Sequence, residues 1–529
     1  MLGRRLGHLA VLAGLAMAGT ALVALPVAAQ DEGKTIVGGF DVGPGGFPGN
    51  FNPLTATAGF TWLNTYYEPL VTYTADLAEM TGDLAADYST SDDLTTFTFN
   101  LADATWHDGE PFTSADVKFT FDLAMNAESG SIFAARLGDV VSVETPDEKT
   151  AVVTLNAPNG GFLSTITQLM MLPEHILGSM PAAELAQSDW WSTSPVGTGP
   201  FSFVQYVSDQ YVELEAFEDY RDGRPQVDQL INRYFADPAA AVAALRAGEI
   251  AFTYAEPDDA GSFEDDADFS VIVGNSFVLN YIGFNHRTEL WDDVRVRQAV
   301  MHAIDRDAII ESLFNGAATK AQCNYVAPQY VPDDLVDYSY DPEKARSLLA
   351  EAGWDQINGT QEISWVTYYD SPQVANVMAA IQSMLAEVGI NVVPRVVDTP
   401  TYNGIVRGDD VDQFPMVYAG AGNGPNPAQH NINLNSDQTP PNGNNIMHIN
   451  LPELDAALET AMSEADTEEV AARWQDVCRI VNEEMPWGSM WVANRYGIAS
   501  NALENFVWTP APGGGPFEMN PEDWDITAQ

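Results

Sequence analysis

Residues 82–126 read GDLAADYSTSDDLTTFTFNLADATWHDGEPFTSADVKFTFDLAMN, and this stretch decides the fold. Its middle alternates strictly between apolar and polar side chains, which is typical of an antiparallel strand with one buried face. The buried face is expected to hold Phe97, Phe99 and Leu101, and the opposite face Thr96, Thr98 and Asn100.

The second half of the stretch predicts a turn followed by a helix. Asp108 and Gly109 favour a turn, and Pro111 excludes a central strand there. Thr113, with Asp116 three residues later, has the pattern of a capping box at a helix start. The helix that follows should bury one face, formed by Val117, Phe121 and Met125.

Residues 1–29 have the features of a secretory signal peptide. Arg4 and Arg5 precede an apolar run at 9–25, and small residues at 27–29 offer a cleavage site. No cysteine follows the run, so we expect no lipid-anchor cysteine. No later segment approaches the roughly 18 apolar residues that span a bilayer. We therefore expect a mature protein in the periplasm or on the extracellular face.

The chain is strongly acidic, with 75 Asp and Glu against 22 Lys and Arg and a formal net charge of −53. Such a field repels phosphate backbones, which excludes nucleic-acid binding as a function. The carboxylates are spread along the whole chain, and this favours a solvated acidic coat suited to a saline medium. A cleft that attracts cationic ligands is the alternative.

The sequence offers no recognisable catalytic or metal centre. Its seven histidines are scattered without the spacing of a helical metal site, so we expect neither a metal nor a cofactor. There is no G-x-S-x-G elbow and no G-x-x-x-x-G-K-[ST] phosphate loop. Carboxylates are too abundant for their spacing to identify a catalytic pair, so a secreted hydrolase stays open.

The two cysteines, Cys323 and Cys478, are candidates for a disulfide bond. An oxidising compartment permits their pairing. Whether their Cα atoms come close enough cannot be read from the sequence, so both states stay open.

The second half of the chain predicts an α/β architecture. A strand at 363–367, a helix at 372–388 and a strand at 390–397 form a unit whose two strands should be parallel. Single helices are expected from Asp292 or Asp293 to Leu313, between 341 and 353, and at 467–484. With 529 residues, 46% of them hydrophobic, the chain can bury more than one core, and two lobes or more are expected.

Five stretches, in order, resemble the family 5 extracellular solute-binding proteins, which deliver peptides, nickel or oligosaccharides to ABC importers. They are WHDGEPFTSADV (106–117), SPVGTGPFSF (194–203), LNYIGFNHRTELWDDVRVRQAVMHAIDRDAII (279–310), DPEKARSLLAEAGW (341–354) and PRVVDTPTYNGIV (394–406). The resemblance implies an α/β, two-lobed fold of the periplasmic-binding-protein type (class II, cluster C-like), with an extra subdomain inserted in the first lobe. The expected boundaries are a signal peptide at 1–29, a first lobe at 30–284 plus 500–529 with the insertion at about 60–195, and a second lobe at 285–499.

The same resemblance implies a function. We expect a monomeric, non-enzymatic receptor that encloses a peptide-like or other polar solute between its lobes by hinge closure. It would deliver the solute to the permease subunits of an ABC importer and their ATPase. The alternatives are an oligosaccharide receptor of the same family, a secreted hydrolase and a structural surface protein.

The candidate ligand-binding residues are aromatic platforms and polar residues at strand ends and in loops. They are Phe40, Asp41, Asn52, Tyr66, Asn285, Trp365, Tyr402, Tyr418, Asn423 and Trp491.

One departure from the family bears on the ligand. The family's peptide receptors have a Trp-x-Ala-Asp-Tyr-Pro-Asp-Pro type segment whose first Asp pairs with the peptide's amino group. The corresponding stretch here is YAGAGNGPNP, residues 418–427, and the Asp position falls on Asn423 or Gly424. Our hypothesis is that this loop reads a neutral polar group; the alternative is that Asn423 only shapes a turn.

Overall fold

The computed structural model describes residues 33–41, 51–55, 63–75, 77, 79–325, 327–422, 424–441, 443–465, 467–508 and 518–527. The compact unit begins at Lys34. In this described part, no helix has the length and apolar character that a membrane crossing requires.

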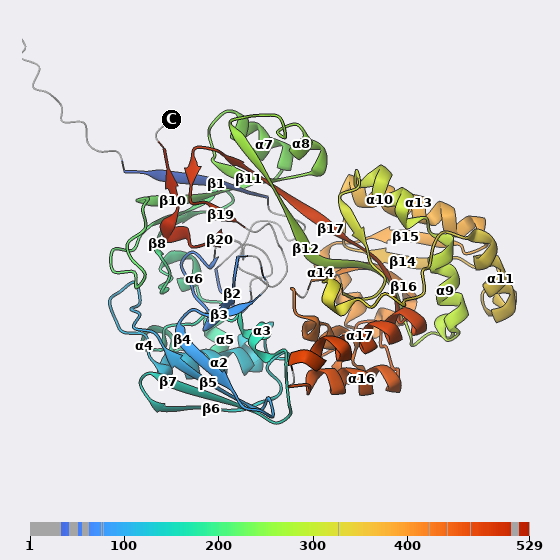
Figure 1. Ribbon diagram of the computed structural model, residues 1–529, viewed down its shortest axis with the longest axis horizontal. Coiled ribbons are helices and arrows are strands. Elements are labelled where there is room, and N and C mark those ends of the chain that lie inside the picture. The colour runs from blue at the N-terminus through green and yellow to red at the C-terminus, as the bar shows by residue number, and fades with distance from the viewer. Residues whose placement is uncertain are drawn as a thin grey trace, which may run out of the picture. The chain divides into compact units, whose positions relative to one another are not determined.

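The largest sheet extends from β8 at one end of the molecule to β15 at the other (Figure 1). Within the described residues it has eleven strands, in the order β15-β14-β16-β12-β17-β11-β1-β10-β9-β8, with β13 paired to β17. The strands are β15 (Val392–Val396), β14 (Ile363–Thr367), β16 (Met416–Gly422), β12 (Phe269–Phe284), β17 (Trp487–Ser500), β11 (Phe252–Ala255), β1 (Thr35–Asp41), β10 (Gln229–Phe235), β9 (Tyr211–Ala216), β8 (Phe201–Val207) and β13 (Ala318–Lys320).

Strands β12 and β17 join the two halves of this sheet. They are 16 and 14 residues long and pair antiparallel, with register shifts between Asn275 and Leu279 and between Asn280 and Tyr281 of β12. One end of β17 pairs with β11, whereas one end of β12 pairs with β16. We call the half with β1 and β8–β11 the first lobe and the half with β14–β16 the second lobe. The two long strands cross from one to the other (Figure 1).

A separate four-stranded sheet belongs to the first lobe and contains the stretch at 82–126. Its order is β4 (Ala85–Thr90), β5 (Thr96–Leu101), β7 (Thr150–Leu155) and β6 (Val140–Asp147), all antiparallel. The predicted alternation is confirmed, because Phe97, Phe99 and Leu101 are buried and Asn100 is exposed. The capping box is also confirmed, with Asp116 accepting from the backbone N–H of Thr113 at the start of α2 (Ser114–Met125).

The helices surround the two sheets. Among the described residues of the first lobe they are α2, α3 (Phe162–Ile166), α4 (Glu174–Leu177), α5 (Ala182–Leu185), α6 (Trp190–Thr193), α7 (Pro238–Arg246) and α8 (Pro257–Gly261). Those of the second lobe are α9 (Val294–Ala303), α10 (Arg306–Leu313), α11 (Pro342–Ala352), α12 (Trp354–Ile357), α13 (Pro372–Glu387), α14 (Thr399–Val406), α15 (Asn431–Leu434), α16 (Pro452–Met462) and α17 (Thr467–Glu484). The remaining described strands form three short pairs: β2 (Val71–Tyr73) with β3 (Met80–Gly82), β18 (Leu503–Glu504) with β21 (Asp525–Ile526), and β19 (Val507–Trp508) with β20 (Glu518–Met519).

Each lobe has its own hydrophobic core. The first-lobe core takes residues between Ile36 and Tyr254 and also Trp508 and Trp524 near the end of the chain. The second-lobe cores take residues between Leu279 and Val492. The chain therefore builds the first lobe, crosses to the second lobe on β12 and returns on β17.

Most predicted elements of the second lobe are confirmed, and one is wrong. Strands β14 and β15 are parallel with α13 between them, and α11 ends at Gly353 in the left-handed conformation. The single helix predicted to run to Leu313 is instead two helices, α9 and α10. The chain breaks at Ile304 because the Asp305 side chain accepts from the backbone N–H of Ala308 and so starts a new helix.

Candidate ligand-binding site

The two lobes also touch through short segments outside the crossing strands. Gln429, in the 3₁₀ turn Pro427–His430, donates from Nε2 to the carbonyl oxygen of Ser164 at 2.9 Å and to its Oγ at 2.6 Å. The backbone N–H of Gly160 donates to the carbonyl oxygen of Met462 at 2.8 Å. We call these contacts the lobe clasp. They hold the four-stranded-sheet part of the first lobe against the second lobe.

A polar cavity of about 70 Å³ lies beside the lobe clasp. The first lobe contributes Ala135, Arg136, Asp139, Asn159, Gly161 and Thr165 to its lining, and the second lobe Ala428, Gln429, Asn431, Ile432, Gln438 and Met462. Arg136 donates to Oε1 of Gln168 at 3.3 Å, and burial lowers its pKa; no described carboxylate forms an ion pair with it. Burial also raises the pKa of Asp139. A hydrogen-bonding solute would find donors and acceptors from both lobes here.

A second, smaller cavity of about 20 Å³ lies where the crossing strands meet two loops of the second lobe. Phe277, Leu279 and Val492 come from the strands. Two loops supply the remaining lining residues, which are Asn324, Tyr325, Ala327, Tyr330, Gly424, Pro425, Pro427 and His430. We call it the hinge cavity. Phe277 also packs against the first-lobe residues Tyr73 and Leu77, so the hinge cavity lies at the joint of the lobes.

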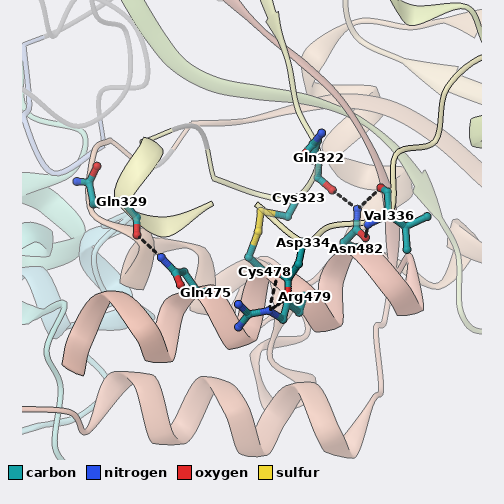
Figure 2. The surroundings of a disulfide bond; sticks show 9 residues. All are labelled: Gln322, Cys323, Gln329, Asp334, Val336, Gln475, Cys478, Arg479 and Asn482. Atoms are coloured by element: carbon teal, nitrogen blue, oxygen red, sulfur yellow. Dashed lines mark hydrogen bonds and ion pairs between the residues drawn. A yellow bond between two sulfur atoms is a disulfide. The ribbon is translucent and has the colours of Figure 1, made fainter. Parts of the chain in front are cut away.

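The loop at 322–336, which forms one wall of the hinge cavity, is fixed to α17 (Figure 2). Cys323 and Cys478 are joined by a disulfide with a Cα–Cα distance of 5.4 Å, so the pairing left open by the sequence is present. Asn482 donates to the carbonyl oxygens of Gln322 at 3.0 Å and Val336 at 3.1 Å. One covalent bond and several hydrogen bonds therefore hold this wall in place.

Three of the aromatic candidates lie in the second-lobe core. Trp365, Tyr418 and Trp491 are buried, and the Tyr418 ring lies 6.0 Å from Trp365 and 6.5 Å from Trp491. The indole N–H of Trp491 donates to Oδ1 of Asn280 at 3.1 Å. None of the three lines the polar cavity or the hinge cavity. As placed, they pack against one another.

Three more candidates, Tyr402, Tyr66 and Asn285, are also buried. Tyr402 packs against Tyr368, with ring centres 4.8 Å apart, and Tyr66 packs against Tyr67 at 4.3 Å. Asn285 donates to the carbonyl oxygen of Val411 and accepts from the N–H of Arg287, which shapes a turn.

The remaining candidates belong to loops and a strand end. Asn52 is buried and accepts from the N–H of Leu54 at 3.0 Å. Phe40 and Asp41 end β1, but their side chains lie outside the described structure. Asn423 lies outside the described residues, whereas Gly424 is described, has φ 70°, and lines the hinge cavity.

Apart from Gly424, the residues that line the two cavities were not predicted from the sequence; among them are Arg136, Asn324, Tyr325 and Gln429. They come from loops and turns far apart in the chain, and no motif connects them. The position of Asn324 directly after Cys323 was the one available signal, because a disulfide fixes the backbone on which its neighbour stands.

Comparison with known proteins agrees with this architecture. Residues 79–442 match the model of the bacterial extracellular solute-binding proteins, family 5, middle part. A putative ABC transporter peptide-binding protein of Brucella melitensis is 61% identical over 494 residues, which is 93% of this chain and 94% of that protein. The dipeptide-binding protein of Escherichia coli is 30% identical over 407 residues, 71% of this chain and 74% of that protein.

The solved structures point the same way. The oligopeptide-binding protein AppA of Bacillus subtilis, in complex with a nonapeptide, superimposes with a TM-score of 0.81 at 25% identity. The match covers 94% of this chain and 100% of that one. Sequence and fold together show that this chain is a two-lobed member of the bacterial extracellular solute-binding proteins, family 5.

Proposed function

We propose that the protein is the extracytoplasmic substrate-binding component of an ABC importer and captures a peptide-like solute between its two lobes. It would then deliver the solute to the permease subunits and their ATPase. Family membership supports the transport role, and the names of the Brucella and Escherichia relatives support peptides as the solute class.

The observation on which this proposal depends most is the interlobe arrangement. Among the described strands, two long ones, β12 and β17, connect the halves of the main sheet. The lobe clasp holds the four-stranded-sheet part of the first lobe against the second lobe, beside a polar cavity. Two bodies on a narrow connection can open and close around a ligand. A solute enclosed between them would be released by parting the lobes, as delivery requires.

The proposal includes the remaining expectations from the sequence. Residues 1–29 would be removed as a signal peptide, leaving a monomer in the periplasm or on the extracellular face. The lobe boundaries would be 30–284 plus 500–529 and 285–499. The candidate ligand residues of the sequence stay part of the proposal, with Arg136 and Gln429 added because they line the polar cavity. The receptor would bind without chemical conversion of its solute.

The experiment is small-angle scattering together with calorimetry on the mature protein. The protein is stripped of bound solute by mild denaturation and refolding and then titrated with a mixed tripeptide set. We expect heat of binding, a smaller radius of gyration and a higher melting temperature, because a ligand that binds only the folded state stabilises it. Unchanged scattering at saturating peptide would contradict capture between lobes, and a changed peptide mass after incubation would favour a hydrolase.

A further inference from the structure

The hinge cavity contains buried polar atoms that no described residue satisfies. Asn324 is 2% exposed, and neither its Oδ1 nor its Nδ2 has a hydrogen-bond partner among the described residues. The hydroxyl of Tyr325 also has no described partner at good hydrogen-bonding geometry; the Asn324 side chain lies near enough to lower its pKa, although burial raises that pKa by more. Buried donors and acceptors nearly always have partners, so these three atoms indicate a group that the protein binds.

The wall that holds these two residues is rigid. Cys323, the residue before Asn324, is bonded to Cys478 on α17, and Gln475 of α17 donates to the carbonyl oxygen of Gln329 at 2.9 Å (Figure 2). The Tyr325 ring contacts Trp474 edge to face at 5.9 Å. Preorganised side chains lose little freedom when a ligand arrives, which is typical of binding sites.

The hinge cavity is electrically neutral. None of the described residues that line it is Asp, Glu, Lys or Arg. Burial lowers the pKa of His430 to about 3, so its imidazole is uncharged near neutral pH, and burial raises the pKa of Tyr325, so its hydroxyl keeps the proton. A charged group would enter without a counter-ion, at a large desolvation cost.

The Asn324 amide and the Tyr325 hydroxyl determine which chemical groups the hinge cavity can bind. A carboxamide both donates and accepts, and a phenol hydroxyl can do either. The cavity volume of about 20 Å³ is larger than the 10–15 Å³ that a water molecule needs, and it is large enough for one small chemical group. An uncharged end-group with donor and acceptor capacity, such as an amide or a hydroxyl, meets both requirements.

We propose that the hinge cavity is a subsite for an uncharged amide or hydroxyl end-group of the solute, with Asn324 and Tyr325 as the residues that recognise it. This rests on the proposed function and narrows its solute class. Among peptides, the subsite selects those whose end is blocked as an amide over those that end in a free ammonium.

The test uses two tripeptide sets that differ only in N-acetylation, dialysed against the mature protein and quantified by mass spectrometry. Wild-type protein should retain the acetylated set better than the free-amine set. Asn324→Asp places a carboxylate in the hinge cavity and should shift the ratio at least tenfold toward the free amines. Wild-type protein that retains the free amines equally well or better, or an unchanged ratio in the variant, would overturn the proposal.

A more conservative variant separates an effect on solute binding from an effect on folding. Tyr325→Phe removes one unpaired hydroxyl and should lower retention of the acetylated set about 3- to 10-fold, the value of one hydrogen bond. The control is Ser364→Ala, which removes another buried hydroxyl without a partner among the described residues, in β14 and away from the hinge cavity. Equal retention by Tyr325→Phe and Ser364→Ala, at equal melting temperature, would contradict the subsite.

A crystal structure of the protein with the solute that it retains on purification distinguishes this proposal from the wider function. A solute atom within hydrogen-bond distance of the Asn324 amide supports the subsite, whatever the solute is. A water molecule in the hinge cavity with the solute bound elsewhere overturns the subsite and leaves the transport role standing. If wild-type protein retains neither peptide set, the proposal that the solute is a peptide fails. The crystal structure with the retained solute then decides alone whether the hinge cavity binds a solute group.

Discussion

Replacing Gly161 by alanine should keep the lobes from closing fully. Gly161 faces Ala428 across the lobe clasp, and a Cβ added to it would lie 2.5 Å from the Cβ of Ala428. Carbon atoms in ordinary contact are about 3.5–4.0 Å apart, so the lobes must part locally by roughly 1 Å or more. Within its own lobe the added Cβ would fit, because the nearest atom there, Oδ1 of Asn159, would lie 3.4 Å away, at an ordinary van der Waals distance.

The size of the effect follows from what the closed form loses. Overpacking a tight contact costs about 1–3 kcal/mol, and parting the lobes also stretches the hydrogen bonds from Gln429 to Ser164 and from Gly160 to Met462. If solute binds only between closed lobes, this cost lowers affinity roughly 5- to 150-fold. The open form has no such contact, so the melting temperature without solute should stay close to that of the wild type.

The assay pairs calorimetry with small-angle scattering, using the solute that copurifies with the wild-type protein. Gly161→Ala should bind more weakly and show a smaller decrease in radius of gyration on binding. The matched control is Gly404→Ala in α14, where an added Cβ meets no atom within 4 Å. Binding affinity and closure of Gly161→Ala equal to those of the control would show that the contact with Ala428 does not limit closure.

Three further predictions concern stability. The melting temperature should rise between about 10 mM and 1 M salt, because screening weakens the self-repulsion of a chain with net charge −53; a flat or falling trend rejects a repulsive acidic coat. Burial and the nearby carboxylate of Asp83, which pairs with the same Arg221, raise the pKa of Glu68 from 4.5 to about 8. The folded state therefore binds one more proton than the unfolded state between these pH values, and the free energy of unfolding should fall as pH rises from 4.5 to about 8. Glu68→Gln should remove this pH dependence in denaturant titrations, and an unchanged pH dependence would show that another group causes it. Reducing Cys323–Cys478, which closes a separation of 155 residues, should lower the free energy of unfolding by about 2–5 kcal/mol, and equal urea midpoints with and without reductant would count against this.

Local features of the sequence were enough to predict much of the fold. The alternation at Phe97 and Phe99, the capping box at Thr113 and the parallel unit around α13 depend on neighbours in sequence, and all three are present. The split of one expected helix at Asp305 was missed because an aspartate inside an apolar pattern can be a surface residue or a cap. Only the backbone conformation at that point distinguishes the two.

The candidate site could be predicted much less well. Aromatic residues serve both cores and binding surfaces, and Trp365 and Trp491 are buried in the second-lobe core. The residues that line the cavities meet only in the folded chain; Arg136 and Gln429, for example, lie almost 300 positions apart by their numbers. Asn324 is buried with both polar atoms of its amide unpartnered, and this is a property of the folded structure that has no sequence pattern.

The most direct test of the central claim is mass spectrometry of the mature protein purified under native conditions, followed by release of whatever small molecule it holds. We expect one peptide-like solute per chain, which rebinds to the stripped protein one to one in calorimetry and is recovered with its mass unchanged. A solute recovered as cleaved products, or a native protein that holds no small molecule and binds none from the tripeptide sets, would contradict it.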